Sequence, residues 1–314
     1  MTDLELNPKT KIYIAGHKGL VGSAVWRLFS SRGFENLIGM TSAELDLRNQ
    51  SEVERFFEAE CPEVVIDSAA RVGGILANHT RPYEFLMDNL KIQCNLIDAA
   101  HRHDAKKFIF LGSSCIYPRI APQPIKEEYL LTSSLEPTNE WYGIAKIAGV
   151  KSCEAIRREF GKDFVSFMPS NLYGPNDNFD LESAHVLPAL IRKFHEAKVN
   201  DNAPVTVWGT GTPMREFLHA DDMALAVMTA VENVLPEGLY NVGFGEDISI
   251  KDLAMILQQV IGHRGEIVWD SSKPDGTPKK VLDISRLKTT GWKPKISLRD
   301  GIKSTYEWFV ASQG

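Results

Sequence analysis

The residues best suited to chemistry in this sequence are a tyrosine and a lysine on one face of a helix. Tyr142 and Lys146 are four positions apart, which is the spacing of helix neighbours. A free tyrosine has a pKa of about 10, and a nearby ammonium group lowers it. Such a pair can pass a proton to or from a carbonyl or alcohol oxygen. Ser113 and Ser114 follow the apolar run Phe108–Leu111. Either hydroxyl can bind the same oxygen, which favours a site over an exposed Tyr-Lys pair.

Cys115 and His185 have side chains that exchange protons near neutral pH. Their reference pKa values are about 8.5 and 6.5. Cys115 comes two residues after Ser113, and His185 lies between a loop and the helical segment that begins at Pro188. The structural alternatives are a small buried cysteine and a histidine that caps a helix. As a pair, one group would remove a proton beside a carbonyl and the other would return a proton to the opposite face.

Gly16, Gly19 and Gly22 form a G-x-x-G-x-x-G pattern after the apolar run Lys11–Ala15. Gly16 permits a tight turn, and Gly19 lets a phosphate approach the start of the following helix. Gly22 lets that helix pack closely on the sheet. The alternative is a glycine-rich turn that binds nothing. The position after the first strand favours dinucleotide binding.

The second expected strand carries no marker of cofactor preference. The sequence there reads Gly39-Met40-Thr41-Ser42, without the acid typical of NAD sites or the arginine typical of NADP sites. The missing acid argues against a preference for NAD. Lys18, inside the glycine loop, can neutralise a 2′-phosphate, unless it is an ordinary solvated lysine.

Short apolar runs alternate with helical patterns through the first half of the chain. We expect strands at 11–15, 37–40, 64–67, 108–111 and 164–168, and helices at 19–32, 51–60, 85–103 and 142–160. Ser51 and Glu54 fit a capping box at the start of the second helix. This alternation predicts right-handed βαβ units. We therefore predict an α/β fold, a Rossmann-type doubly wound parallel sheet with a smaller C-terminal α/β substrate domain.

After Pro169 the pattern changes to loops and shorter elements. We expect a loop at 171–184, helices at 188–196, from about 221, at 250–261 and at 298–311, and strands at 205–208, 239–242 and 267–269. Residues 1–169 are expected to form an NADP-binding Rossmann domain, with a return segment around 217–246. Residues 170–216 and 247–314 are expected to form the substrate-binding domain, over the carboxyl edge of the sheet.

The composition is that of an ordinary globular protein. The 314 residues are 43% hydrophobic and 24% charged, and 35 basic against 41 acidic residues give a net charge of −6. These values exclude a disordered or membrane-spanning chain and argue against non-specific nucleic-acid binding. Four cysteines without a C-x-x-C pair form no disulfide framework. His101 and His103 lack a third ligand, so we expect no metal. We expect a cytoplasmic protein with no membrane or nucleic-acid partner.

The glycine loop, Ser113 and the Tyr142-x-x-x-Lys146 pair occur in an order that resembles the extended short-chain dehydrogenase/reductase family. Five further segments, at 112–118, 135–139, 171–175, 208–217 and 273–278, resemble its members that act on GDP-linked 4-keto-6-deoxy sugars. The resemblance covers the chain from about Lys11 to Trp308. It implies a Rossmann domain that binds NADP(H) and a sugar-nucleotide substrate.

The resemblance also implies an activity and roles for the residues above. It implies an NADPH-dependent oxidoreductase that is also an isomerase: it epimerises C3 and C5 of GDP-4-dehydro-6-deoxy-α-D-mannose and reduces C4 to give GDP-β-L-fucose. Cys115 and His185 match the family's epimerisation pair. Tyr142 matches the proton donor, Lys146 the residue that holds the nicotinamide ribose, and Ser113 the residue that orients the keto oxygen. Relatives often form homodimers through two long helices, to which 85–103 and 142–160 correspond.

Two sets of binding residues follow from the same resemblance. NADP(H) is expected at Gly16, His17, Lys18, Gly19, Leu20, Val21, Gly22, Leu111, Gly112, Ser113, Ser114, Tyr142, Lys146, Pro169, Ser170, Asn171, Leu172 and His185. The GDP-sugar is expected at Lys193, Trp208, Arg215, Asp275 and Lys280. Several relatives carry arginine at the position of Lys193, and lysine keeps the charge but loses the bidentate fork. Single lysines such as Lys193 and Lys280 are commonly just solvated, whereas Arg215 lies in a glycine-rich turn.

Two other functions stay open on the sequence alone. A UDP-hexose 4-epimerase with bound NAD would oxidise and re-reduce one carbon without consuming cofactor, and it would not need Cys115 and His185. A dinucleotide-sensing binding protein would turn nothing over and would tolerate loss of the Tyr-Lys pair. Net oxidation of NADPH by a keto-sugar separates the three.

Overall fold

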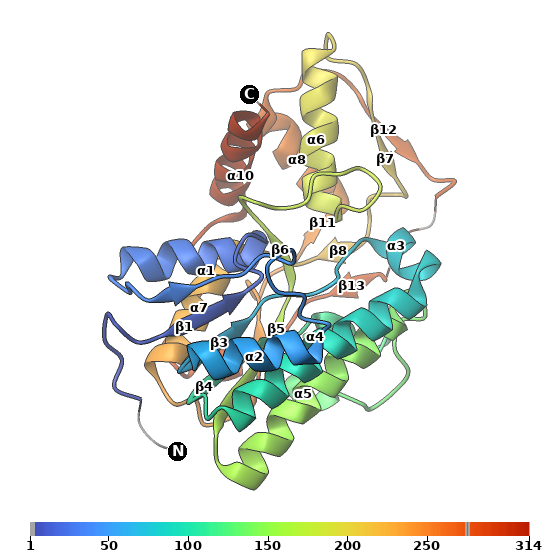
Figure 1. Ribbon diagram of the computed structural model, residues 1–314. Coiled ribbons are helices and arrows are strands. Elements are labelled where there is room, and N and C mark those ends of the chain that lie inside the picture. Colours follow the sequence, from blue (N-terminus) through green and yellow to red (C-terminus); the bar gives the residue numbers. More distant parts are fainter. Residues whose placement is uncertain (1–3, 274, 276, 314) are drawn as a thin grey trace.

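A six-stranded parallel sheet forms the larger part of the protein (Figure 1). The computed structural model describes residues 4–273, 275 and 277–313, so Pro274 and Gly276 of the 273–278 motif lie outside the described residues. The sheet order is β10-β5-β4-β3-β1-β2. Its strands are β1 (Ile12–Ala15), β2 (Leu37–Ile38), β3 (Val64–Asp67), β4 (Lys107–Leu111), β5 (Asp163–Pro169) and β10 (Leu239–Val242). The predicted fold class is confirmed.

Helices cover both faces of this sheet (Figure 1). On one face α1 (Leu20–Ser31) packs against α7 (Ala220–Glu232), and on the other lie α2 (Gln50–Glu60), α4 (Pro82–Arg102) and α5 (Glu140–Phe160). Every residue of β1, β3, β4 and β5 is buried. Burial on both faces explains why these strands appear as continuous apolar runs in the sequence.

The strand order reverses between β1 and β3. The chain passes from β1 outward to β2 and then returns to place β3 on the other side of β1. In open α/β sheets, ligands bind beyond the carboxyl ends of the strands at such a reversal. The glycine loop follows β1 at this point.

The smaller part lies beyond that edge of the sheet, at the top of Figure 1. Its helices are α6 (Val186–Val199), α8 (Ile250–Ile261) and α10 (Leu298–Ser312). Three small sheets accompany them: β7 (Val205–Trp208) with β12 (Ile267–Asp270), β8 (Met214–Arg215) between β11 (Ile248–Ser249) and β13 (Lys279–Lys280), and β6 (Asn171–Tyr173) with β9 (Phe217–His219). The remaining short elements are α3 (Ile75–Thr80), η1 (Ser114–Ile116), η2 (Glu127–Tyr129) and α9 (Ser285–Lys288).

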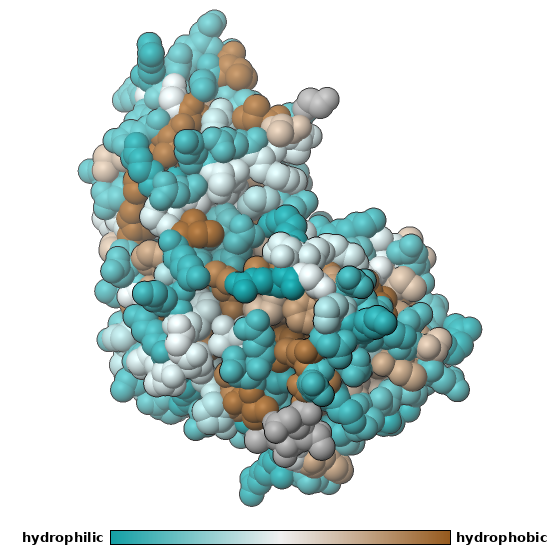
Figure 2. All heavy atoms as spheres, turned by 90° about the vertical axis from the view of Figure 1, so that its left-hand side faces the viewer, coloured by the Kyte–Doolittle hydropathy of each residue, from teal (hydrophilic) through white to brown (hydrophobic). Residues whose placement is uncertain are grey.

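Two clusters of buried apolar side chains correspond to these two parts. The larger cluster lies around the parallel sheet, and the smaller joins α6, α8 and α10. Leu282, Ile284, Leu287 and Trp292 pack in the larger cluster, although they follow residue 246. Hydrophilic residues dominate the face shown in Figure 2, where apolar side chains appear in small groups. Within the described residues, no helix has both the length and the apolar character needed to cross a bilayer.

The start of α2 differs from the predicted capping box. The helix begins at Gln50, and the Asn49 side chain accepts hydrogen bonds from the backbone N–H groups of Ser51 and Glu52. Glu52 in turn accepts a bond from the Asn49 amide at 2.8 Å. The box predicted from Ser51 and Glu54 is therefore wrong, because asparagine one position before the helix satisfies those donors first. Glu54 instead pairs with Arg102 and His103 on α4.

A buried ion pair fastens the amino ends of β4 and β5 to the return segment. Lys107 and Asp163 are in register on these strands, and the Lys107 Nζ lies 2.6 Å from an Asp163 carboxylate oxygen. Lys107 also donates to the carbonyls of Ala230 and Asn233. The second Asp163 oxygen accepts from Arg157 at 3.1 Å.

We expect Asp163→Ala to destabilise the fold by about 3–5 kcal/mol, because it leaves two buried cations without their shared anion. The free energy of unfolding in guanidinium chloride measures this loss. Glu154→Ala is the matched control, since the exposed Lys151–Glu154 pair contributes at most about 1 kcal/mol. Equal losses in the two variants would contradict the assignment.

Candidate active site

The glycine loop has the geometry of a phosphate cradle. Gly16 has φ +76°, and a Cβ at Gly22 would lie 2.1 Å from the Gly16 carbonyl oxygen. α1 starts at Leu20 with Gly19 as its N-cap, and no side chain of the described residues caps it. A Cβ at Gly19 would meet only the Gly16 oxygen, at 3.4 Å. The free N–H groups at this helix start fit the diphosphate of a dinucleotide.

The end of β2 leaves room for the ring of His17. A Cβ at Gly39 would lie 2.4 Å from the His17 ring, so a larger residue at this position would displace the ring. Burial and the neighbouring Lys18 lower the pKa of His17. Glu44 accepts hydrogen bonds from the backbone and hydroxyl of Thr41, both at 2.7 Å. Lys18 is exposed in the loop, and its charge acts on both His17 and Glu44.

α5 places Tyr142 and Lys146 against the end of β4, as their spacing predicts. The Lys146 Nζ donates to the Leu111 carbonyl oxygen at 2.9 Å. The same ammonium lies 4.7 Å from the centre of the Phe110 ring and 5.9 Å from that of Tyr142. A hydrogen bond with Ser113 also acts on the Tyr142 hydroxyl. The structure thus brings Ser113, Tyr142 and Lys146 together.

The expected effect of Lys146 on Tyr142 is not met. Burial raises the pKa of Tyr142 above its ordinary value, Cys115 adds to the rise, and the hydrogen bond with Ser113 opposes it. Burial also lowers the pKa of Lys146 to about 8. Removal from water disfavours the Tyr142 phenolate and the Lys146 ammonium more than their mutual attraction favours them. Tyr142 therefore keeps its proton near neutral pH, so a proton is present on the hydroxyl for donation.

Cys115 lies in η1, directly against the start of α5. Its backbone N–H donates to the Ser113 hydroxyl at 3.2 Å, and its Sγ accepts from the side-chain amide of Asn139 at 3.2 Å. A Cβ at Gly143 would lie 2.9 Å from the Cys115 carbonyl oxygen. Asn139 was not found from the sequence. Its position three residues before Tyr142 could have suggested it.

His185 stands at the start of α6 as its N-cap residue. Its side chain is exposed, yet the surrounding protein replaces part of its hydration and lowers its pKa. A lower pKa favours the neutral imidazole, which can act as a base. Among the described interactions, no hydrogen bond joins His185 to Cys115 directly.

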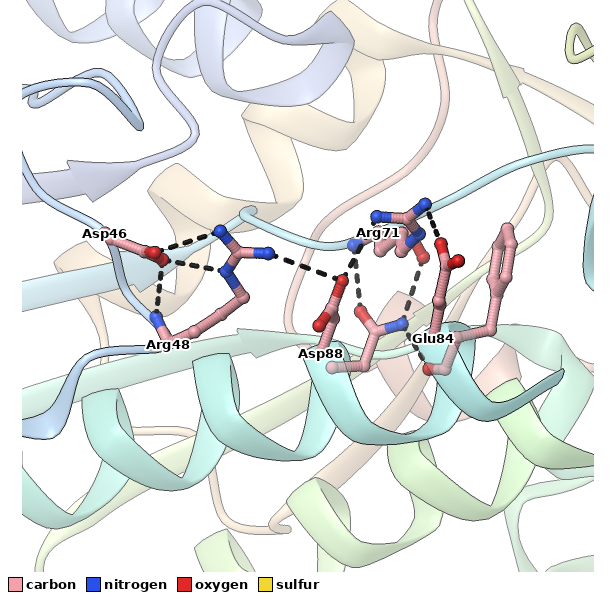
Figure 3. A network of polar contacts seen from close by, with 7 residues as sticks. Asp46, Arg48, Arg71, Glu84 and Asp88 are labelled. Carbon is pink, nitrogen blue, oxygen red and sulfur yellow. Dashed lines mark hydrogen bonds and ion pairs between the residues drawn. The ribbon is translucent and has the colours of Figure 1, made fainter. Parts of the chain in front are cut away.

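The segment after β3 connects this histidine to the large sheet. The Gly74 N–H donates to the Ser183 carbonyl, two residues before His185. Arg71 anchors the same segment to α4 through ion pairs with Glu84 and Asp88, as Figure 3 shows.

A buried asparagine completes this anchor. The Asn89 side chain accepts from the Arg71 N–H at 2.9 Å and donates to the Arg71 carbonyl at 3.0 Å. Asp88 extends the chain of ion pairs to Arg48 at 3.7 Å (Figure 3). These positioning contacts were not found from the sequence, because they join segments that no motif connects.

The other expected cofactor residues lie at the carboxyl ends of β4 and β5. The Gly112 N–H donates to the Phe167 carbonyl, and the Ser170 N–H donates to the Val242 carbonyl. Asn171 donates to the Glu216 carbonyl at 2.8 Å. These bonds fix Leu111–Ser114 and Pro169–Leu172 along one edge, together with the loop of Gly16 to Gly22.

Two of the expected substrate cations are neighbours in register. β13 pairs with β8 so that Lys280 lies opposite Arg215. Arg215 donates to the Thr277 carbonyl at 2.5 Å. The Asp275 carboxylate accepts from the N–H and hydroxyl of Thr210 at 2.9 and 2.7 Å, and its negative charge also acts on Arg215. Paired cations of this kind fit a diphosphate.

Two lysine ammonium groups lie near the ring of Trp208. The Lys193 Nζ lies 5.8 Å and the Lys273 Nζ 5.5 Å from the centre of the ring. Trp208 remains 62% exposed, so most of its side chain is accessible to a ligand. Lys193 and Trp208 were expected from the sequence, whereas Lys273 was not. Among the described residues, no group of three or more His, Cys, Asp or Glu side chains could hold a metal ion.

Residues 12–243 match the NAD dependent epimerase/dehydratase family. The chain belongs to this family. GDP-L-fucose synthase 1 of Arabidopsis thaliana is 56% identical over 300 residues, which cover 96% of this chain and 93% of that protein. GDP-L-fucose synthase of Escherichia coli (strain K12) is 50% identical over 314 residues, covering 97% and 98%.

The fold of this epimerase/dehydratase chain also matches solved structures. The crystal structure of a GDP-L-fucose synthetase from Naegleria fowleri bound to NADP has a TM-score of 0.90 at 30% identity, covering 99% of this chain and 95% of that one. The resemblance inferred from the sequence motifs is confirmed by these relatives.

Gly19→Ala and Gly22→Ala separate cofactor binding from folding. Gly22→Ala is expected to cost about 1–3 kcal/mol of stability, because the new Cβ meets backbone. Gly19→Ala should cost less than about 1 kcal/mol but weaken NADPH binding about tenfold, since a methyl group blocks the phosphate. Thermal unfolding and NADPH fluorescence titration measure the two effects. Unchanged NADPH affinity in Gly19→Ala would contradict the phosphate cradle.

Proposed function

We propose that this chain converts GDP-4-dehydro-6-deoxy-α-D-mannose to GDP-β-L-fucose, as a 3,5-epimerase and an NADPH-dependent 4-reductase. The relatives named GDP-L-fucose synthase align over nearly their whole length. The observation that carries the proposal is the contact of α5 with residues 113–116, which puts a thiol beside a Ser-Tyr-Lys set.

Cys115 and His185 carry out the two epimerisations. The 4-keto group makes the C3 and C5 protons acidic, because the carbanion is stabilised as an enolate. One residue removes the proton and the other delivers one to the opposite face of the carbon. The lowered pKa of His185 and the hydrogen bond from Asn139 to the Cys115 sulfur support these roles.

Ser113, Tyr142 and Lys146 carry out the reduction. NADPH, when bound, supplies the hydride that C4 receives. Ser113 holds the keto oxygen, and Tyr142 donates its proton to that oxygen as the alcohol forms. Lys146 holds the nicotinamide ribose through its ammonium group.

The remaining residues bind the two ligands. The proposed cofactor part is residues 1–169 with the return segment 217–246, and the substrate part is 170–216 with 247–314. Arg215 and Lys280 neutralise the diphosphate of the GDP-sugar, and Trp208 with Lys193 contacts its ring systems. Asp275 holds the turn that carries them, through Thr210.

We also propose a homodimer in the cytoplasm. α4 and α5 carry the exposed apolar side chains of Tyr83, Trp141 and Ile144, which suit an interface between copies. The four cysteines are all free, as is typical of a reducing compartment.

Cys115→Ser tests the epimerase half. With GDP-4-dehydro-6-deoxy-mannose in D₂O and no NADPH, the variant should lose deuterium incorporation at C3 and C5 by at least about 100-fold. With NADPH, any oxidation should give GDP-rhamnose, identified by NMR, instead of GDP-L-fucose. Cys61→Ser is the matched control, since its thiol is exposed at the end of α2. Normal fucose formation by Cys115→Ser would remove the epimerase assignment, and no net NADPH oxidation by the unchanged chain would favour a 4-epimerase or a non-catalytic binder.

Lys18→Ala tests the preference for NADPH. Removal of this cation should weaken NADPH binding about tenfold and leave NADH binding unchanged, because only NADPH carries the 2′-phosphate. Lys9→Ala, in a turn before β1, controls for a change of net charge. Equal losses of affinity for NADPH and NADH would show that Lys18 contacts a part of the cofactor other than the 2′-phosphate.

A further inference from the structure

Asp67, the last residue of β3, is a fully buried acid that the reaction above does not use. One carboxylate oxygen accepts from the Ala69 N–H at 3.2 Å. The other oxygen has no hydrogen-bond partner among the described residues. A buried carboxylate without a compensating partner is costly, so the group either binds a proton or is balanced by an opposite charge nearby.

The sheet register places Asp67 beside the ring that supports Lys146. Asp67 pairs with Phe110 on β4. In-register residues of adjacent parallel strands point to the same face, with the strands about 5 Å apart. The Lys146 ammonium lies 4.7 Å from the centre of that Phe110 ring. The carboxyl of Asp67 and the ammonium of Lys146 are therefore neighbours of the same aromatic ring on the face covered by α5.

The described groups that interact with Asp67 are uncharged near neutral pH. They are the hydroxyls of Tyr13 on β1 and Tyr142 on α5 and the thiol of Cys153 on α5, which interacts with the Ser166 hydroxyl on β5. Among the described residues, Asp67 is the one charge that acts on the Lys146 pKa, and Lys146 is the one charge that acts on Asp67.

We propose that Asp67 is a positioning residue for the 4-reduction: its carboxylate is the counter-ion that keeps the Lys146 ammonium charged at the carboxyl end of β4. The proposal rests on the proposed function, because it acts through the role given there to Lys146. An opposite charge in the same low-dielectric surroundings favours the charged form of a buried group. Lys146 donates to Leu111, and within the described part of the chain no acid other than Asp67 acts on its charge.

The direction of the pH effect follows from the titration of the lysine. Burial lowers the pKa of Lys146 to about 8, and Asp67 opposes this decrease. Burial raises the pKa of Asp67 to about 6, and Lys146 opposes this rise. Near neutral pH both groups are charged. Without the carboxylate only the desolvation of Lys146 remains, so the lysine loses its proton at a lower pH.

Asp67→Asn keeps the shape of the side chain and removes its charge. NADPH oxidation by the keto-sugar is measured as a function of pH. We expect the alkaline limb of this pH–rate profile to move to lower pH by about one unit or more. Deuterium exchange at C3 and C5 without NADPH should keep its pH profile, because Cys115 and His185 do not depend on Lys146. Glu127→Gln is the matched control, a buried acid on η2 that pairs with Arg286, and it should leave the limb in place.

An unchanged alkaline limb in Asp67→Asn would overturn the proposal. The affinity for NADPH as a function of pH, measured by fluorescence, gives the same comparison without turnover. If the unchanged chain fails to reduce the keto-sugar, the proposed function fails while this binding titration still decides the role of Asp67. The proposal would also be overturned if the pH midpoint of NADPH affinity were the same in the unchanged chain and in Asp67→Asn.

A double variant covers the case in which Asp67→Asn folds poorly. Removing both charges, in Asp67→Asn with Lys146→Met, should raise the thermal midpoint above that of Asp67→Asn alone, because the unpaired buried cation is gone. Additive losses in the two single variants and the double variant would show that the charges are not coupled, and would overturn the proposal.

Discussion

The close packing of α5 against β4 is the constraint on which the site depends. A Cβ at Gly143 would lie 2.9 Å from the Cys115 carbonyl oxygen, and a Cβ at Gly149 would lie 2.4 Å from the Phe110 ring. Because both residues are glycines, the helix comes near enough for Lys146 to reach the end of the strand. A larger side chain at either position would displace the helix and separate the thiol, the phenol and the ammonium together.

This packing also places two kinds of chemistry at the start of one helix. Asn139 contacts the Cys115 sulfur, and three residues later Tyr142 interacts with Ser113. In the proposed reaction the same keto group activates the C3 and C5 protons and then accepts the hydride at C4. A single carbonyl held at this helix start is therefore within reach of both steps without a change of site.

Local patterns were sufficient to predict much of the fold. The strands at 64–67 and 239–242 and the helix at 250–261 have the predicted bounds, because continuous apolar runs and helical spacing reflect burial directly. The spacing of Tyr142 and Lys146 likewise fixed their common face. The two-residue strands of the smaller part were not predicted, because a pair such as Met214–Arg215 has too few residues to show a period.

The contacts that the sequence did not reveal join distant segments. Arg71 reaches α4, Asn139 reaches Cys115, and Asp67 reaches the surroundings of Lys146 only once the sheet has formed. The pKa of Tyr142 was misjudged for a related reason. The spacing predicts that the lysine is near the tyrosine. It does not reveal how deeply the tyrosine is buried, and this burial raises its pKa.

The register between β8 and β13 limits how the chain can change in length. Lys280 lies beside Arg215 because Lys279 pairs with Met214 one step earlier. Successive side chains of a strand point to opposite faces, so inserting or deleting one residue between Asp275 and Lys279 would turn the lysine away from the arginine. The position of the lysine beside the arginine therefore depends on the pairing of the two strands as well as on the identity of the two side chains.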